Sequence, residues 1–96
     1  MSIRIVLTRT AKPGKTSALA AAYKERCRAV QQEPGCEQFE VFQGVENPER
    51  FVVMERWKDE AAEEAHRLLT QAGQPVVREL SVGAGEREDY TYNRTR

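Results

Sequence analysis

His66 is the only histidine in the chain, and histidine is the side chain best suited to exchanging protons near neutral pH. It lies in a segment with helical periodicity, beside the small apolar residues Ala62 and Ala65. Partial loss of solvent at such a position favours the neutral imidazole, which can accept a proton. The sequence therefore offers one candidate general base. The alternative is a histidine at the core boundary that hydrogen-bonds a backbone carbonyl, because a single histidine without a recognisable partner meets few criteria for a catalytic site.

Glu55 and Trp57 stand two residues apart in a run of β-forming residues, so their side chains share one face of a strand. An indole ring can contact a planar aromatic ligand while its N–H donates to an oxygen. A buried carboxyl group must be paired or protonated. Both residues are therefore candidates for substrate binding. The alternatives are a core anchor for Trp57 and an ion pair with an arginine for Glu55.

Four further residues are candidates for the wall or mouth of a cavity between a helix and the sheet: Tyr23, Phe39, Phe42 and Arg9. The three aromatic residues have spacings that are more often found in a core. Arg9 is included because it stands at the end of the first predicted strand, where a long side chain can reach a cavity mouth.

The remaining potential nucleophiles and ligands favour structural roles. Cys27 and Cys36 are too far apart for a CxxC motif and too few for a disulfide framework. We predict core packing for Cys27 and a structural role for Cys36 at the start of a strand. Glu60, Glu63 and Glu64 are predicted to form a solvated helix face. Because no second histidine stands at ligand spacing, we expect no metal site.

Composition limits the class of protein. A chain of 96 residues predicts one domain, residues 1–96. Its 15 basic and 15 acidic residues balance, so no net charge attracts nucleic acid or an anionic membrane surface. No apolar stretch is long enough to span a bilayer or to form the core of a signal peptide, and the predicted location is cytoplasmic.

Two periodicities predict the elements that must position these residues. Alternation with a period of two predicts strands over residues 3–10, 38–43, 51–57 and 86–94. Helical periodicity predicts helices over residues 16–32 and 61–70, with a short third helix from Pro75. Pro34 and Gly35 end the first helix, and Asp59 caps the second.

The two shorter helices are predicted to bury apolar side chains. The second helix would turn Ala62, Ala65 and Leu69 inward, with His66 bordering that stripe. The third helix would turn Val76, Val77 and Leu80 inward.

The order of these elements predicts an α+β fold of the ferredoxin-like βαββαβ type, with a four-stranded antiparallel sheet. In the third strand, Phe51 and Val53 point one way while Val52 and Met54 point the other, so both faces are largely apolar. The helices can cover one face. On a chain this short, a second copy is expected to cover the other, which predicts a homodimer.

Residues 33–66 resemble the antibiotic biosynthesis monooxygenase family. The resemblance rests on Glu33-Pro34-Gly35-Cys36, on Phe39 and Val41, on Asn47-Pro48 with Phe51, on Glu55-Arg56-Trp57 before Asp59, and on Ala65-His66. Similarity to this family implies the ferredoxin-like fold and the pairing of two sheets face to face into a dimeric α+β barrel. Some members oxygenate phenols or hydroquinones with O₂ and without a metal or flavin.

The resemblance implies a cofactor-independent monooxygenase that acts on a small aromatic, such as a quinol or a polyketide-type phenol, in a pocket between sheet and helices. By this resemblance His66 is the base, Trp57 holds the ring, and Tyr23 or Arg9 steadies the oxygen. Many relatives carry a second histidine in a Thr-Pro-His segment, where this chain has Leu68-Leu69-Thr70-Gln71. Two alternatives stay open: a non-catalytic dimeric module that binds a small apolar molecule, and an isomerase or cyclase that uses the same pocket.

Overall fold

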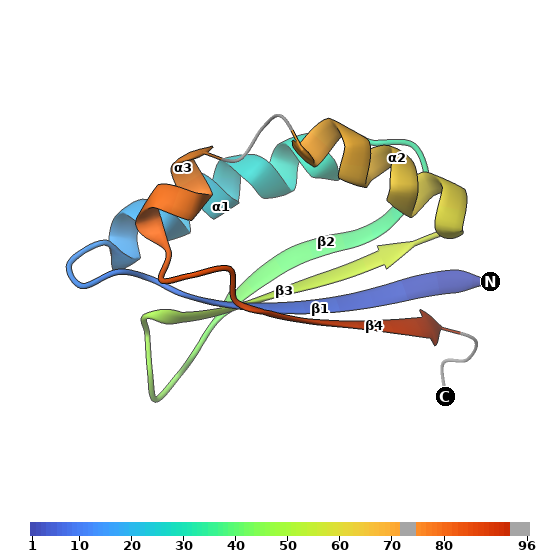
Figure 1. Ribbon diagram of the computed structural model, residues 1–96. Helices are drawn as coiled ribbons and strands as arrows, with labels where there is room; N and C mark the ends of the chain where they lie inside the picture. Colours follow the sequence, from blue (N-terminus) through green and yellow to red (C-terminus); the bar gives the residue numbers. More distant parts are fainter. Residues whose placement is uncertain (72–74, 93–96) are drawn as a thin grey trace.

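The computed structural model describes residues 1–71 and 75–92 of the chain (Figure 1). The elements are β1 (Ser2–Thr10), α1 (Thr16–Val30), β2 (Cys36–Gln43), β3 (Arg50–Trp57), α2 (Glu60–Gln71), α3 (Pro75–Leu80) and β4 (Glu86–Tyr92). The last predicted strand was expected to reach residue 94, and residues 93–94 lie outside the described residues. In the described ranges, the helices are too short or too polar to cross a membrane.

The strands form one antiparallel sheet in the order β2-β3-β1-β4. Together with the two crossover connections, this order confirms the predicted ferredoxin-like α+β fold. Figure 1 shows the three helices on one face of the sheet, with α2 over one end of the strands and α3 beside α1 over the other. Within residues 1–71 and 75–92, no helix covers the opposite face of the sheet, and β2 and β4 are the edges of the sheet.

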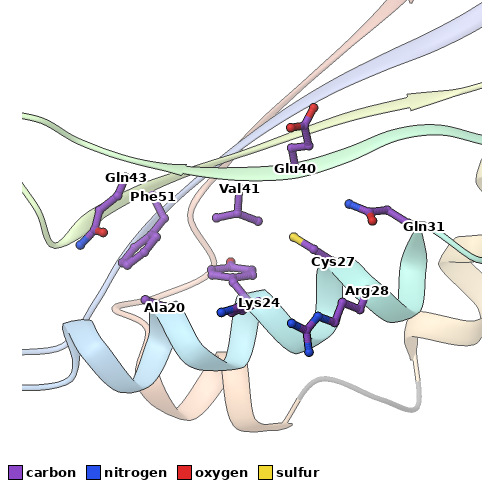
Figure 2. A pocket seen from close by; sticks show the side chains of 10 residues that line it. Ala20, Lys24, Cys27, Arg28, Gln31, Glu40, Val41, Gln43 and Phe51 are labelled. Carbon is purple, nitrogen blue, oxygen red and sulfur yellow. The ribbon is translucent and has the colours of Figure 1, made fainter.

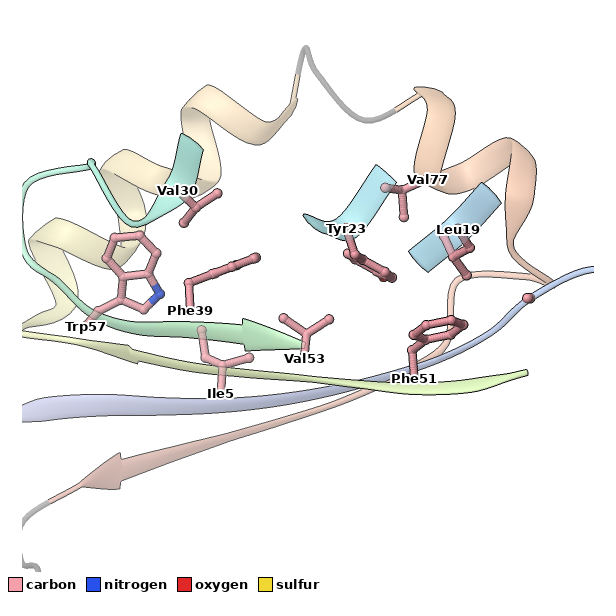
Figure 3. Packing of buried hydrophobic residues seen from close by; sticks show 10 residues of the cluster. Ile5, Leu19, Tyr23, Val30, Phe39, Phe51, Val53, Trp57 and Val77 are labelled. Atoms are coloured by element: carbon pink, nitrogen blue, oxygen red, sulfur yellow. The ribbon is translucent and has the colours of Figure 1, made fainter. Parts of the chain in front are cut away.

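The core lies between the helices and the covered face of the sheet (Figure 3). The residues of β3 alternate as predicted, and Phe51, Val53 and Trp57 are all buried. Leu19 and Tyr23 of α1 are buried and reach down to meet them. Residues of β3 on the open face, such as Met54, stay only partly buried within one chain.

Two short helices present faces that the sequence analysis assigned wrongly. On α2, Ala65 is exposed and Leu69 is 66% exposed, whereas Glu63 and His66 are buried. The helix is therefore turned by about one residue, roughly 100°. The prediction assumed that an inward face is apolar, but this part of the sheet offers polar and aromatic partners instead. On α3, Val77 is buried as expected, while Val76 is 56% exposed.

The turn between α1 and β2 is pressed against the beginning of α2. Gly35 has a φ of 81°, and a Cβ atom at this position would lie 2.5 Å from Cβ of Ala62. The N–H of Lys58 donates to the carbonyl of Gly35 at 2.9 Å, and Asp59 caps α2 by accepting from the N–H of Ala62 at 2.9 Å. These contacts hold the turn containing Glu33 beside α2.

Candidate active site

The imidazole of His66 is held between aromatic rings at one end of the sheet. Its ring is stacked on the indole of Trp57, with centroids 4.5 Å apart and an interplanar angle of 26°. The ring of Phe39 lies 5.9 Å away and is tilted by 60°. His66 is 6% exposed and Trp57 is fully buried. Because both neighbours come from rigid strands, the imidazole has one defined orientation.

Glu33 fixes the protonation pattern of this histidine. Its Oε1 atom lies 2.9 Å from Nδ1 of His66. An ionised carboxylate only accepts hydrogen bonds, so Nδ1 carries the proton and donates. In the neutral imidazole, Nε2 is then the basic atom. The sequence analysis assigned no role to Glu33, although it belongs to the quoted motif that ends the first helix.

The contacts that the described residues make with Nε2 of His66 are long. Oγ1 of Thr70 lies 3.4 Å away and Oε1 of Glu55 lies 3.8 Å away. Thr70 Oγ1 accepts a hydrogen bond from the Arg26 guanidinium at 3.0 Å, which leaves its own hydrogen free to point at Nε2. A proton arriving on Nε2 would place the imidazolium between the carboxylates of Glu33 and Glu55. This arrangement suits a general base.

Glu55 is a buried carboxyl group on the same strand face as Trp57. The indole N–H of Trp57 donates to Oε1 of Glu55 at 2.9 Å. Burial raises the pKa of Glu55, and the Trp57 hydrogen bond together with the charges of His66, Arg87 and Arg26 opposes this rise. Glu55 is paired as the sequence analysis required, but with the neighbouring indole and His66 rather than with an arginine across the sheet.

Arg26 is a second residue whose role only the structure reveals. Its guanidinium lies 5.7 Å from the centroid of Phe39 and hydrogen-bonds Thr70. Burial lowers its pKa, and the negative charges of Glu55 and Glu33 act in the opposite direction. The available sequence signal was its position, three residues after Tyr23, on the inward side of α1.

Two hollows lie near these residues. An open groove of about 320 Å³ between the 33–35 turn and α2 has His66 and Glu33 among its lining residues, together with Ala62, Ala65 and Leu69. A second open cavity, of about 390 Å³, lies between α1 and the sheet and is lined by Tyr23 but not by His66.

The structure thus divides the predicted site residues into two groups. In the first group, His66 lies together with Trp57, Glu55 and Phe39. His66 lines the groove beside α2, whereas the other three residues line neither the groove nor the cavity under α1. The second group, Tyr23 and Arg9, lies near the other end of the sheet. The ring centroids of Tyr23 and Phe51 are 5.9 Å apart, and Phe51 is paired with Arg9 in the strand register.

The cysteines and acidic residues show no ligand cluster in the described part of the chain. Cys27 and Cys36 are free thiols, and no three side chains of the usual donor types gather there. Burial, with smaller contributions from nearby carboxylates, raises the pKa of Cys36 to about 11. Glu63, predicted to be solvated, is 8% exposed and pairs with Arg67 at 3.3 Å and Arg87 at 3.4 Å.

Comparison with known proteins identifies a family. The profile described as antibiotic biosynthesis monooxygenase matches residues 2–72, which is well over half of the chain. None of the curated proteins matches at a significant level.

Solved structures share the fold over nearly their full lengths. A conserved protein from Methanosarcina mazei Go1 is 27% identical with a TM-score of 0.87, and the match covers 97% of this chain and 94% of that one. A candidate antibiotic biosynthesis monooxygenase from Nitrosomonas europaea is 24% identical with a TM-score of 0.82, covering 93% and 88%. Another candidate, from Deinococcus radiodurans, is 20% identical with a TM-score of 0.79, covering 100% and 96%.

Proposed function

The chain belongs to the antibiotic biosynthesis monooxygenase family, and we propose that it is a monooxygenase that uses O₂ to oxidise a small electron-rich aromatic, such as a quinol or a polyketide-type phenol, without a metal or flavin. The observation that carries this proposal is the buried His66, stacked on Trp57 and bonded through Nδ1 to Glu33 at 2.9 Å. Such a histidine can take a proton from a phenol, and deprotonation is the step that makes a phenol able to react with O₂ itself.

The proposed reaction needs little from the protein beyond this base. His66 Nε2 accepts the phenol proton, and the phenolate passes one electron to O₂. The resulting radical pair forms a carbon–oxygen bond to give a peroxide anion, which takes the proton back from His66. The hydroperoxide then loses water to leave a quinone carbonyl. One oxygen atom enters the product, the other leaves as water, and all the electrons that reduce O₂ come from the substrate.

The surroundings of His66 favour its positive form once the proton has moved. Glu33 faces one ring nitrogen, and Glu55 lies 3.8 Å from the other. Because both carboxyl groups are mostly buried, their interaction with an imidazolium is weakly screened. We propose that Glu33 is a positioning residue, since it acts on the substrate only by orienting His66.

We propose that the substrate enters through the groove beside α2. This groove reaches His66 directly, and its wall carries the apolar side chains of Ala62, Ala65 and Leu69. His66 covers the ring of Trp57, so contact between substrate and Trp57 requires the imidazole to move aside. In the structure as it stands, Trp57, Glu55 and Phe39 support the base rather than touch the groove.

We also propose that the protein is a homodimer formed through the open face of the sheet. The centre of this face is apolar, because Val6 pairs with Met54 and Phe42 pairs with Val52 in the register. Phe42 was predicted to line a cavity between helix and sheet, but it lies on this open face instead and is 48% exposed within one chain. A patch of this kind is seldom left in contact with water, and two copies related by a two-fold axis would bury it.

O₂ uptake tests the proposed reaction. Wild type and His66→Ala would be compared on a panel of 1,4-hydroquinones and 1-naphthols, in chelator-treated buffer, after circular dichroism shows that both are folded. We expect uptake above autoxidation for the wild type and a loss of about a hundredfold or more in kcat/KM for the variant. Glu46→Ala in the exposed hairpin is the matched control and should behave as wild type.

The other outcomes select among the alternatives. Equal uptake by wild type and His66→Ala would remove His66 from the mechanism. Conversion of a panel compound without O₂ would indicate an isomerase or cyclase. Tight binding of panel compounds without any conversion would indicate a binding module.

A further inference from the structure

The hydroxyl group of Thr70 links the buried histidine to a cation on α1. Its Oγ1 atom accepts a hydrogen bond from the Arg26 guanidinium at 3.0 Å and lies 3.4 Å from Nε2 of His66. A guanidinium can only donate, so the single hydrogen of the hydroxyl group is available for the imidazole. A ring nitrogen that accepts this hydrogen carries a lone pair and no proton. The contact therefore favours the imidazole whose basic atom is Nε2.

Two carboxyl groups flank the imidazole and favour its charged form. Glu33, in the turn after α1, lies 2.9 Å from Nδ1, and Glu55 of β3 lies 3.8 Å from Nε2. A negative charge close to a histidine stabilises the imidazolium. Both nitrogens of an imidazolium are donors, so this form cannot accept a proton from a substrate. A base at this position requires a group that opposes the two carboxyl groups.

Arg26 places a positive charge one hydroxyl group away from Nε2. Its side chain is half-buried, and its guanidinium lies 5.7 Å from the centroid of the Phe39 ring. Arginine stays charged at any pH at which a protein is folded. A positive charge in this place disfavours a second positive charge on the imidazole, and partial burial reduces its screening by water.

The ionisable groups on the other strands near His66 do not supply the same effect. Arg87 of β4 acts on Glu55 by its charge, but its guanidinium is itself paired with Asp89 at 2.7 Å. Cys36 at the start of β2 is neutral, because burial raises its pKa to about 11. Arg26 is thus the cation that the described residues connect to the basic atom of the histidine.

We propose that Arg26, acting through the hydroxyl group of Thr70, keeps Nε2 of His66 unprotonated at neutral pH, and that Arg26 and Thr70 are positioning residues of the site. The hydroxyl donates to the lone pair of Nε2, and the guanidinium opposes a proton on the same atom. His66 is thereby held in its basic form between two carboxyl groups. The consequence for catalysis rests on the proposed oxygenase reaction, whereas the effect on the proton affinity of His66 does not.

NMR of the full chain tests the proposal directly, because His66 is the only histidine and gives one set of imidazole signals. The ¹⁵N shifts of the ring show which nitrogen carries the proton, and a pH titration of the Cε1–H signal gives the midpoint of protonation. In the wild type at pH 7.5 we expect a proton on Nδ1 and none on Nε2. In Arg26→Met the proton affinity of the imidazole should rise about tenfold, because a like charge is removed, and the midpoint should move up by about one pH unit.

Three variants separate this role from a loss of packing. Arg26→Met keeps an unbranched side chain against Phe39, and Arg26→Lys keeps the charge and should retain most of the wild-type behaviour. Thr70→Val removes the hydroxyl group at nearly constant volume. It should raise the proton affinity of His66 about threefold, because the neutral imidazole loses a hydrogen bond.

Arg28→Met is the matched control for the loss of a positive charge from α1. Arg28 is exposed, and Figure 2 shows its side chain lying along α1 rather than pointing toward the sheet as Cys27 does. Because water screens a charge in this position, the titration of His66 in Arg28→Met should match that of the wild type.

Three results would overturn the proposal. The first is a wild-type imidazole that carries a proton on Nε2 at pH 7.5. The second is a titration midpoint in Arg26→Met that equals or lies below that of the wild type. The third is an equal midpoint in the wild type and Thr70→Val. If Arg26→Met does not fold, the first and third results still decide.

The O₂ assay separates this proposal from the proposed function. In an active oxygenase, the acidic limb of the kcat/KM profile should move to higher pH in Arg26→Met in parallel with the NMR midpoint, and the plateau at high pH should stay close to that of the wild type. A profile that does not move with the NMR midpoint would refute the catalytic consequence. If the wild type consumes no O₂ with any compound of the panel, the oxygenase proposal fails, while the NMR titration still decides the role of Arg26.

Discussion

The contact between Glu33 and His66 is the feature of this protein that can be tested most directly by a double-mutant cycle. The cycle comprises wild type, Glu33→Ala, His66→Ala and the double variant. Each single change also removes other contacts, such as the stacking of His66 on Trp57. The coupling term of the cycle cancels these and isolates the interaction of the two side chains.

The structure sets the size of that coupling. The two polar atoms are 2.9 Å apart, and the side chains are 20% exposed for Glu33 and 8% exposed for His66. Hydrogen bonds to a charged group contribute about 1.5–3 kcal/mol to stability. Because solvent still reaches part of the Glu33 carboxylate, we expect a coupling at or somewhat below the lower end of that range, about 1–2 kcal/mol.

The assay is urea unfolding at pH 7 followed by far-UV circular dichroism. All proteins are kept at one concentration, because the stability of the proposed dimer would depend on it. Circular dichroism is preferable to tryptophan fluorescence, since Trp57 touches His66. A parallel cycle that pairs His66→Ala with Glu46→Ala should give no coupling, because Glu46 is exposed in the hairpin. A Glu33–His66 coupling below about 0.3 kcal/mol is within the error of additivity and would refute the assigned contact.

Four further predictions follow from single sites. Gly35→Ala should lower the free energy of unfolding by about 2–4 kcal/mol, because alanine is strained at this positive φ and its Cβ clashes with α2. Gly14 also has a positive φ but has open space around it, so Gly14→Ala should lower the free energy of unfolding only by the part due to backbone strain. Burial raises the pKa of Glu55 above its ordinary 4.5, so the wild type loses stability as pH rises from about 4.5 through the raised pKa. Glutamine at this position does not titrate. The Tm of Glu55→Gln relative to wild type should therefore increase between pH 4 and pH 7. With a pKa of about 11 against an ordinary 9.0, Cys36 should hold about a hundredfold less thiolate at pH 7.5, and alkylation followed by mass spectrometry should show correspondingly slow labelling. Met54→Lys places a charge on the open sheet face and should halve the mass measured by light scattering, and a wild type that is already monomeric would contradict the proposed dimer.

The sequence was sufficient for the fold because the fold depends on local patterns. Alternation in β1 and β3, the helical stripe of Leu19, Tyr23 and Val30, and the stop at Gly35 each follow from the period of one element or the chemistry of one turn. The order of the elements then leaves few ways to build an antiparallel sheet with helices on one face. His66, Trp57 and Glu55 were also singled out as candidates from residue type and spacing, and the structure places their side chains together.

The partners of these residues were decided by tertiary structure. Glu33 is 33 residues from His66 in the sequence, and they meet because the Gly35 turn is hydrogen-bonded to Lys58, just before α2 begins. The orientation of α2 could not be predicted, because its apolar periodicity favours Leu69 as an inward residue while the sheet beneath it offers Glu55 and Trp57. A buried polar cluster is stabilised by contacts between distant segments, and hydrophobic periodicity carries no information about such contacts.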